Sequence, residues 1–174
     1  YQELEKLTLN GTILDIGGSR KSGYHEKVKG DHTWTVVNYG DTHPGADLLF
    51  NAEEKFPLGD NTYDNVVTLN VIEHIFDTHN VFSETARVLK PGGLFISAIP
   101  YMHHIHGSPS DYVRYTESAY EKFAEKYGFE IIYIRAVGEG LLSLAYQNIS
   151  GWFYLSFLKN LFKRIFIFLD KLFQ

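Results

Sequence analysis

Short, continuous apolar runs recur along the first part of this chain. The clearest runs lie at residues 12–18, 34–39, 64–70 and 93–99, with a weaker one at 46–50. Most of them are apolar at neighbouring positions rather than at alternate ones, which is typical of strands buried on both faces of a parallel sheet. The hydrophobic pattern therefore predicts a mainly parallel sheet.

Helical spacing appears between the last two of these strands. Within residues 78–90 the spaced positions are Val81, Phe82, Thr85, Val88 and Leu89. The following segment 90–93, Lys-Pro-Gly-Gly, predicts the end of this helix, because a basic last turn, a proline and a glycine pair stop a helix. A strand, a helix and a strand joined so closely indicate parallel strands and a right-handed crossover.

The remaining segments complete an α/β pattern. They are, in order, a loop or short helix at 20–30, a loop at 101–115, a helix at 116–127, a strand at 129–137 and further helix. Only 15 residues separate Ser19 from Thr35, so the first crossover helix must be short or distorted, and no clear antiparallel last strand follows. We expect a core domain at 1–138 and a hydrophobic helical tail at 139–174.

Composition narrows the class of protein. The 174 residues are 44% apolar, which is enough for one hydrophobic core. The net charge of −5 and the pI of 5.9 give no basic field that would favour nucleic acid. Because the chain has no cysteine, disulfides and thiolate metal sites are excluded, and a reducing compartment fits.

The first strand ends in an acid and a glycine turn. Asp15 closes the run and Gly17 and Gly18 follow it. Glycine lets a backbone approach a ligand closely, and an open parallel sheet binds nucleotide-like ligands at the carboxyl ends of its strands. Turn formation alone is the alternative explanation of the same residues.

Four motifs together resemble the class I S-adenosylmethionine-dependent methyltransferases. They are ILDIGG (13–18), KFPLGDNTYDNVVTLNVIEHI (55–75), ETARVLKPGGLFISAIP (84–100) and HGSPSDYVRYT (106–116). The chain is most similar to small type-11-like methyltransferase domains of polysaccharide and quinone biosynthesis, over residues 10–137. The resemblance implies a doubly wound, Rossmann-like sheet. From the residue pattern we expect this chain to lack a full first helix and the last antiparallel strand of that sheet. It also implies S-adenosylmethionine as cofactor.

The resemblance assigns the cofactor contacts residue by residue. The expected binding residues are Asp15, Gly17, Gly18, Ser19, Asn38, Asn51, Ala52 and Asn70. Asp15 would meet the methionine ammonium, since a carboxylate suits a cation. Asn38 stands where relatives carry the ribose-binding acid, and Asn51 and Ala52 stand beside the adenine. Asn38 and Asn51 could instead be turn residues.

The loop 101–114, YMHHIHGSPSDYVR, is the expected acceptor side. Its candidate catalytic residues are His106, Asp111 and Arg114. The imidazole of His106 could take a proton from an acceptor hydroxyl, Asp111 could orient that imidazole, and Arg114 could hold an acceptor carboxylate or phosphate. In the alternative, Asp111 and Arg114 lock the loop to the following helix, which Thr116 caps alone.

Further histidines in this part of the chain carry weaker hypotheses. His103, His104 and His106 could supply nitrogen ligands, but no second carboxylate cluster has a convincing spacing, so no metal is expected. Glu73 and His74 match the family pattern. We expect His74 to order the loop after its strand, and Glu73 to lie on the cofactor side of the cleft.

The tail is the second unusual feature. From Trp152 to Phe173 nearly every residue is large and apolar, and the exceptions are Ser156, Lys159, Asn160, Lys163, Arg164, Asp170 and Lys171. Charges interrupt this helix too often for a segment of about 20 apolar residues that spans a bilayer. It therefore predicts either a membrane-surface helix or a packing surface for a homodimer or the core.

These expectations combine into one function. We expect a methyltransferase that uses S-adenosylmethionine on a small-molecule or glycan- or lipid-linked acceptor, with transfer to oxygen slightly favoured. The alternative is a degenerate methyltransferase fold that acts as a non-catalytic binding or scaffold subunit. A nucleotide-sugar or dinucleotide enzyme fits less well, because the glycines lack the GxGxxG spacing. The expected location is the cytoplasm, either free or at the inner face of the membrane.

Overall fold

A five-stranded parallel sheet forms the core of the chain, in the order β3-β2-β1-β4-β5. Its strands are β1 (Gly11–Ile16), β2 (His32–Asn38), β3 (Leu48–Leu49), β4 (Tyr63–Leu69) and β5 (Leu89–Ala98). The structure, a computed structural model, describes residues 3–40, 45–107, 109–137, 140–149 and 156–172. From β1 the chain runs outward to β3 and then crosses back to β4, so the sheet is doubly wound. The predicted fold class is confirmed.

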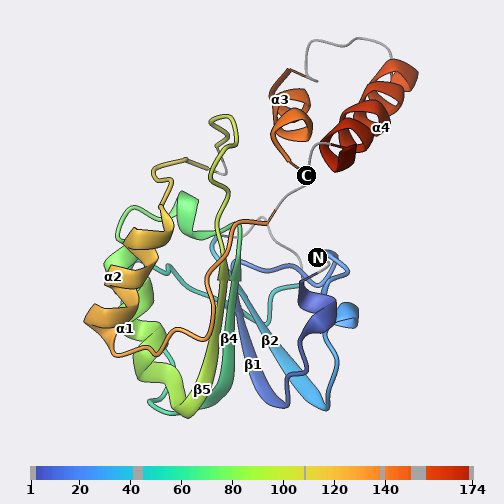
Figure 1. Cartoon of the computed structure of the whole chain (residues 1–174). Coiled ribbons are helices and arrows are strands. Elements are labelled where there is room, and N and C mark those ends of the chain that lie inside the picture. The colour runs from blue at the N-terminus through green and yellow to red at the C-terminus, as the bar shows by residue number, and fades with distance from the viewer. Residues whose placement is uncertain (1–2, 41–44, 108, 138–139, 150–155, 173–174) are drawn as a thin grey trace. The chain divides into compact units, whose positions relative to one another are not determined.

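Neighbouring residues of the central strands face opposite sides of the sheet. On β1, Leu14 packs with Val66 and the α1 residue Val88, whereas Ile13 packs with Val67 and Tyr24. The helices α1 (Thr78–Val88) and α2 (Glu117–Tyr127) cover the first side, as Figure 1 shows. The short helices η1 (Leu4–Lys6) and η2 (His25–Lys27) cover the other side. Burial on both faces explains the continuous apolar runs.

Side-chain caps start both long helices of this region. Asp77 accepts a hydrogen bond from Asn80 N at the start of α1, and the Thr116 hydroxyl accepts one from Ala119 N at the start of α2. The prediction that Thr116 caps its helix is confirmed. The helix expected at 78–90 ends at Val88, because Leu89 already pairs with Tyr63 of β4 as the first residue of β5.

The connections differ in part from the expected pattern. Between β1 and β2 the chain forms only the three-residue η2, which confirms a distorted first crossover. No strand forms in the described part of 129–137, so that prediction is wrong. Ile132 and Tyr133 are 75% and 57% exposed, and the segment pairs with no described strand. An apolar run becomes a strand only where a neighbouring strand supplies its hydrogen bonds.

The chain divides into two compact units. One comprises Tyr1–Ile99 and Gly107–Ile131, and the other comprises Pro100–His106 and Ile132–Gln174. The second unit contains α3 (Leu141–Ile149) and α4 (Ser156–Leu172), which pack against each other. The boundary predicted at residue 138 and the start of the predicted helix at Trp152 lie outside the described residues. Among the helices that the structure describes, none is long and apolar enough to cross a membrane.

Candidate active site

The carboxyl ends of β1, β2 and β4 bring together most of the residues that the sequence singles out. The strand order reverses between β1 and β4, and open parallel sheets bind ligands where this reversal occurs. Asp15 and Gly17 lie at the end of β1, Asn38 at the end of β2, and Asn70 directly after β4. The fold therefore positions these four residues at one edge of the sheet.

Asp15 is a fully buried carboxylate. Its Oδ2 accepts a hydrogen bond from the Tyr24 hydroxyl at 2.5 Å and lies 2.7 Å from His25 Nε2. Its Oδ1 is also buried and has no hydrogen-bond partner among the described residues. A buried acceptor without a donor is costly, so this oxygen is suited to a ligand that donates to it.

Tyr24 and His25 are site residues that the sequence analysis missed. They lie in the short crossover after β1, and the centroid of the His25 ring is 4.4 Å from that of Trp34 on β2, with the rings tilted at 53°. The His25 side chain is only 13% exposed, so it stays in contact with Asp15. Tyr24 and His25 are neighbouring aromatic residues in a crossover too short for a full helix. That pattern was the only sequence signal that could have pointed to them.

The turn after β1 leaves no room for side chains. Gly17 has a φ of +75°, and a Cβ on it would lie 2.5 Å from Val71. A Cβ on Gly18 would lie 1.9 Å from Asp15 Oδ2. Ser19 continues the turn, since its carbonyl accepts from Ser22 N at 2.9 Å. The glycines thus let the backbone pass close to the Asp15 carboxylate, whereas Ser19 has a turn-forming role.

Asn38 ties β2 to this turn. Its Nδ2 donates to Gly18 O at 3.0 Å, and its Oδ1 accepts from Tyr39 N at 2.8 Å. The side chain is half-buried and uncharged, and an amide oxygen can accept a second hydrogen bond. Asn38 therefore stabilises the turn, and its Oδ1 can still accept a hydrogen bond from one more donor.

Asn51 and Ala52 belong to the segment between β3 and β4. Asn51 Oδ1 accepts from Glu53 N at 3.0 Å, and its Nδ2 donates to Glu54 Oε1 at 3.3 Å. This is the turn role that the sequence offered as the alternative for Asn51. Asn70, at the end of β4, takes a φ of +54°, and its backbone N donates to Ala98 O.

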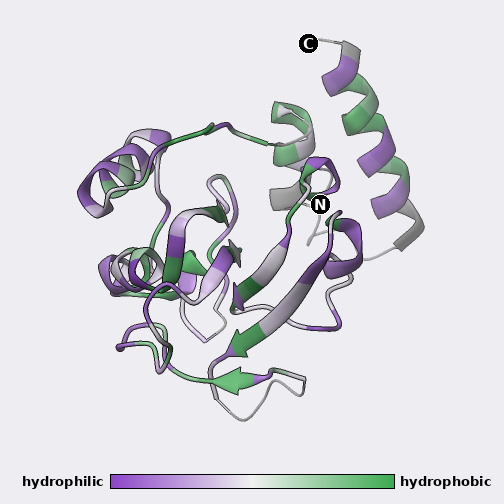
Figure 2. Ribbon diagram, turned by 90° about the horizontal axis from the view of Figure 1, so that it is seen from below, coloured by the Kyte–Doolittle hydropathy of each residue, from purple (hydrophilic) through white to green (hydrophobic). Residues whose placement is uncertain are grey.

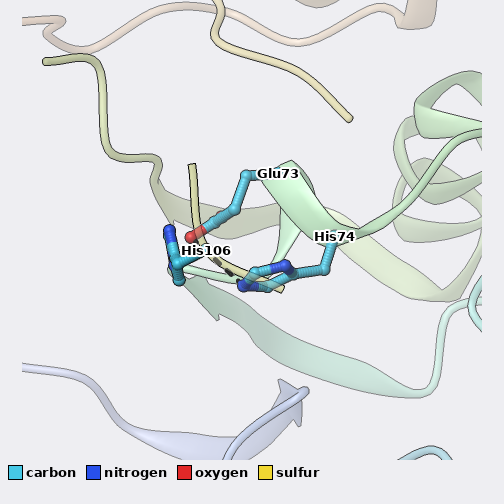
Figure 3. A group of neighbouring side chains, drawn as sticks. All are labelled: Glu73, His74 and His106. Carbon is cyan, nitrogen blue, oxygen red and sulfur yellow. Dashed lines mark ion pairs between the residues drawn. The ribbon is translucent and has the colours of Figure 1, made fainter. Parts of the chain in front are cut away.

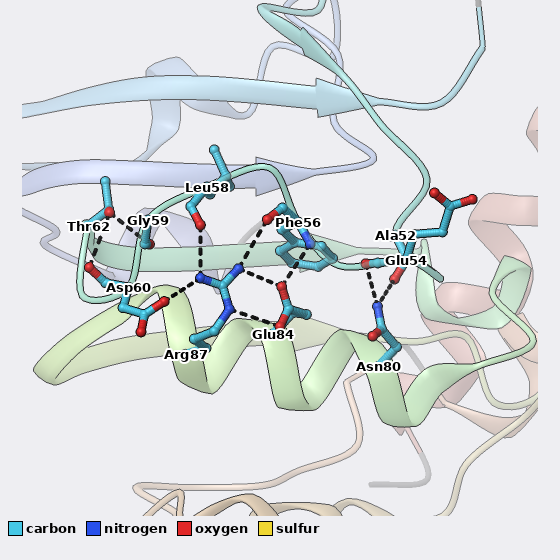
Figure 4. A network of polar contacts seen from close by, with 10 residues as sticks. All are labelled: Ala52, Glu54, Phe56, Leu58, Gly59, Asp60, Thr62, Asn80, Glu84 and Arg87. Carbon is cyan, nitrogen blue, oxygen red and sulfur yellow. Dashed lines mark hydrogen bonds and ion pairs between the residues drawn. The ribbon is translucent and has the colours of Figure 1, made fainter.

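Side chains of α1 hold the segment between β3 and β4 in place (Figure 4). Asn80 Nδ2 donates to Ala52 O at 2.8 Å and to Glu54 O at 2.7 Å. At the other end of the segment, Arg87 donates to Leu58 O at 2.8 Å and to Phe56 O at 3.1 Å. Asn80 therefore fixes the end of the segment that carries Asn51 and Ala52.

Glu84 completes this anchoring network. It pairs with Arg87 at 2.5 Å and accepts from Phe56 N at 2.7 Å. The hydrogen bond from Arg87 outweighs burial and lowers the pKa of Glu84, and the pKa of Arg87 is raised in turn. Both side chains stay charged at neutral pH. Glu84 and Arg87 belong to the motif 84–100, but their structural role could not be predicted from it.

Glu73 and His74 form the turn η3 (Ile72–His74) after β4 (Figure 3). Glu73 is fully buried, and its Oε1 lies 3.7 Å from His74 Nε2. His74 Nδ1 lies 2.5 Å from Ser110 O, and Tyr112 N donates to Glu73 O at 2.7 Å. Both residues thus contact the loop before α2, which is not the loop directly after the strand that His74 was expected to order.

Asp111 and Arg114 pair with each other within that loop. The guanidinium makes two hydrogen bonds to the carboxylate, one of them from Nη2 to Oδ2 at 2.6 Å. Asp111 is only 3% exposed, and its hydrogen bonds raise the pKa of Arg114. An ion pair of this kind was expected in the alternative in which Asp111 and Arg114 have a structural role. A catalytic role for either residue stays a prediction.

The three loop histidines lie in the other compact unit. The ring centroids of His103 and His104 are 4.2 Å apart, and those of His103 and His106 are 4.7 Å apart. His106 Nδ1 lies 3.2 Å from His104 O. The structure thus groups the imidazoles, and the role of His106 as a base stays a prediction.

Three hydroxyl groups form a hydrogen-bonded row near the carboxyl ends of β4 and β5. Thr68 Oγ1 donates to Ser97 Oγ at 2.9 Å, and Ser97 Oγ lies 3.0 Å from the Tyr120 hydroxyl. Burial raises the pKa of Tyr120 to about 12. The phenol therefore remains neutral at physiological pH and can serve as a hydrogen-bonding group, not as a base.

Comparison with known proteins agrees with this geometry. A family model described as "Methyltransferase domain" matches residues 32–97. A protein of Mycolicibacterium smegmatis named "Probable S-adenosylmethionine-dependent methyltransferase" is 38% identical over 66 residues, which are 38% of this chain and 26% of that protein. An "Uncharacterized methyltransferase" of Mycobacteroides abscessus is 29% identical over 110 residues, 55% of this chain and 42% of that protein.

Solved structures agree on the fold. A "SAM dependent methyltransferase" from Aquifex aeolicus superimposes with a TM-score of 0.61 at 18% identity, over 79% of this chain and 83% of that one. Residues 32–97 are thus similar to a methyltransferase domain, and the sheet has the fold of S-adenosylmethionine-dependent methyltransferases. It spans less than half the length of the two curated relatives.

Proposed function

We propose that this chain binds S-adenosylmethionine and transfers its methyl group to a small-molecule or glycan- or lipid-linked acceptor. The observation that carries the proposal is the buried Asp15 carboxylate, whose Oδ1 has no partner among the described residues. It lies beside a glycine turn at the strand ends of a methyltransferase sheet. The names of the relatives point to the same cofactor.

The residues at the strand ends fit this cofactor. Asp15 would hold the ammonium of the methionine part, since a desolvated carboxylate binds a cationic donor strongly. Gly17 and Gly18 would let the backbone approach it, and Asn38 would accept a bond from a ribose hydroxyl. The segment with Asn51 and Ala52, which Asn80 holds, would lie beside the adenine. When bound, the cofactor supplies an electrophilic methyl group on its sulfonium.

Acceptor chemistry is assigned to the loop that follows β5. We infer that the imidazole of His106 takes the proton of an acceptor hydroxyl as its oxygen gains the methyl carbon. An imidazole suits this step because its ordinary pKa is close to neutral pH. Arg114 stays charged beside Asp111 and would hold an acceptor carboxylate or phosphate.

A non-catalytic binding role is the second candidate. Asn38 and Asn51 are neutral where relatives carry acids. In each side chain, both the Oδ1 and the Nδ2 already make a hydrogen bond within the protein. Such a site binds the nucleoside more weakly than a charged one would. In this second function the chain would bind S-adenosylmethionine or its product without transferring a methyl group.

Calorimetric titration of the chain tests the proposal. We expect saturable binding of S-adenosylmethionine and S-adenosylhomocysteine, and none of NAD, which serves as the control for a dinucleotide site. Absence of both heat and a thermal shift at millimolar S-adenosylhomocysteine would overturn the proposal. Binding alone fits either candidate.

Methyl transfer separates the two candidates. With the labelled methyl donor, we expect label to enter a glycan or lipid fraction. The His106→Ala variant should lower that rate about a hundredfold and leave the affinity for S-adenosylhomocysteine unchanged. Equal transfer by His106→Ala and wild type would remove His106 from the mechanism, and binding without any transfer would support the non-catalytic role.

A further inference from the structure

The helices α3 and α4 are joined by side-chain contacts at the start of α3 and within it. Asp170 of α4 accepts hydrogen bonds from Leu142 N at 2.9 Å and Ser143 N at 2.6 Å, and a further one from the Ser143 hydroxyl. Tyr146 of α3 donates to Lys159 O of α4 at 2.5 Å. These contacts determine which side of α4 faces α3.

Asp170 acts as the cap of α3. The carboxylate lies against Gly140, where a Cβ would come within 2.4 Å of it. Burial raises the pKa of Asp170, but the hydrogen bonds from Ser143 and Leu142 outweigh it and lower the pKa below the ordinary value. The carboxylate is therefore ionised at the N-terminus of α3, where a negative charge is favourable. Asp170 does not contribute an exposed acid to α4.

The opposite side of α4 is apolar and exposed. Leu161, Ile165 and Phe168 are 51%, 41% and 64% exposed. Their spacing of four and three residues places them in one stripe, on the side of the helix away from Asp170. Hydrophobic and hydrophilic segments alternate along α4 in Figure 2, as expected of an amphipathic helix. We call Leu161, Ile165 and Phe168 the α4 stripe.

The charges beside the α4 stripe are positive. The basic residues of α4 are Lys159, Lys163, Arg164 and Lys171, and its one acid is the buried Asp170. Arg164 and Lys171 are exposed and flank the stripe by helical spacing. The unit that contains α4 has five lysines and arginines against two acids, a net charge of +3, whereas the other unit has 11 against 19, a net charge of −8.

We propose that the α4 stripe docks this chain on an anionic membrane surface. The apolar side chains would enter the boundary between headgroups and acyl chains, and the flanking cations would meet the anionic headgroups. Charge argues against a second copy as the occupant, because pairing two stripes would bring Arg164 and Lys171 of one chain close to the same residues of the other. This proposal does not depend on methyl transfer.

Vesicle flotation of the full chain tests the docking. At low salt the protein should float with vesicles of equimolar phosphatidylcholine and phosphatidylglycerol, and stay at the bottom with phosphatidylcholine alone. Raised salt should release it, because salt screens exposed charges. Failure to float with the anionic vesicles, or equal flotation with both, would overturn the proposal.

Two double variants and one single variant test whether vesicle binding depends on α4. Arg164→Gln with Lys171→Gln should weaken partitioning roughly fivefold for each charge removed. Ile165→Ser with Phe168→Ser should abolish flotation, and Ile132→Ser, which changes another exposed apolar residue of the same unit, should float like wild type. Circular dichroism and sedimentation check folding and oligomeric state. A dimer that the stripe variant converts to monomer, without vesicle binding, would show that a second copy covers the stripe.

Discussion

Asp15 and Asp64 lie at opposite ends of the paired strands β1 and β4, and both pack against a glycine. A Cβ on Gly18 would collide with the Asp15 carboxylate, and one on Gly11 would lie 2.3 Å from that of Asp64. Asp64 accepts from Thr12 N at 2.8 Å, from Thr12 Oγ1 at 2.9 Å and from Lys90 Nζ at 2.8 Å. Among the described residues, Asp15 has hydrogen-bond partners on one oxygen only.

This difference separates a structural carboxylate from the carboxylate that we propose to bind the ligand. The hydrogen bonds from Lys90 and Thr12 lower the pKa of Asp64 to about 2. The ionised carboxylate therefore links residues of β1, β4 and β5. Asp15 is more deeply buried, and yet no described residue donates a hydrogen bond to its Oδ1. Folding alone does not explain such an oxygen, whereas a cationic ligand does. We therefore propose that the amino end of the sheet is the structural end and the carboxyl end is the binding end.

The largest effect is expected for Asp15→Asn. If Asp15 meets the ligand ammonium, this change should weaken binding of S-adenosylhomocysteine by roughly tenfold to a hundredfold, because a charge-assisted hydrogen bond is lost. Methylthioadenosine, which lacks the amino-acid part, should bind both proteins equally. Titration calorimetry of the two ligands on the two proteins measures the difference.

The comparison with methylthioadenosine controls for damage to the fold. Equal losses for both ligands would mean that Asp15→Asn disturbs the whole site, for example through Tyr24 and His25. No loss for S-adenosylhomocysteine would show that the buried oxygen has no part in ligand binding, and Asp15 would then resemble Asp64.

The two glycines provide the next test of the comparison. Gly18→Ala and Gly11→Ala each force a methyl group against an aspartate, which should cost about 1–3 kcal/mol of unfolding free energy. Only Gly18→Ala should also weaken binding of S-adenosylhomocysteine, because it displaces Asp15. Denaturant unfolding gives the stability and calorimetry gives the affinity.

Gly23→Ala serves as the matched control for Gly11→Ala, because Gly11 also has a positive φ, of +83°. Gly23 has a φ of +70° but nothing within 4 Å of an added Cβ, so it reports backbone strain without a collision. If Gly11→Ala weakened binding as much as Gly18→Ala, the division between a structural and a binding end of the sheet would be wrong.

Local patterns predicted the sheet and its glycine turn. Buried central strands such as β1 and β4 are apolar at neighbouring positions because helices or turns cover both faces, and this leaves a signal in the sequence. Gly17 and Gly18 were identifiable because a close backbone approach excludes a side chain. The same reasoning found Asp15, since an acid directly before such a turn lies at the end of its strand.

Contacts between distant segments were not predictable in this way. Tyr24 and His25 return to Asp15 from a crossover without periodicity, and Asn80 reaches Ala52 across 28 positions. The segment 129–137 has the local pattern of a strand, but whether it pairs depends on a neighbour that local sequence does not specify. The Asp111–Arg114 pair was foreseen as an alternative because both partners lie in one loop.

The smallest expected effect concerns Asp64 and pH. Because the pKa of Asp64 is about 2 in the folded chain and near its ordinary value of 3.8 when unfolded, protonation favours unfolding. Its contribution to stability should be complete above about pH 4 and should disappear as the pH falls to about 2. The Asp64→Asn variant, which mimics the protonated side chain in charge, lacks this contribution at every pH.

The difference in melting temperature between wild type and Asp64→Asn isolates this group from the other carboxylates. We expect a lower melting temperature for the variant at neutral pH and a gap that closes between about pH 4 and pH 2. Lys90 and Asp64 are 42% and 35% exposed, so added salt should also narrow the gap. A gap that persists at pH 2 would assign the effect to packing against Gly11. Weaker S-adenosylhomocysteine binding by Asp64→Asn would show that Asp64 also serves the site and that the two ends of the sheet are coupled.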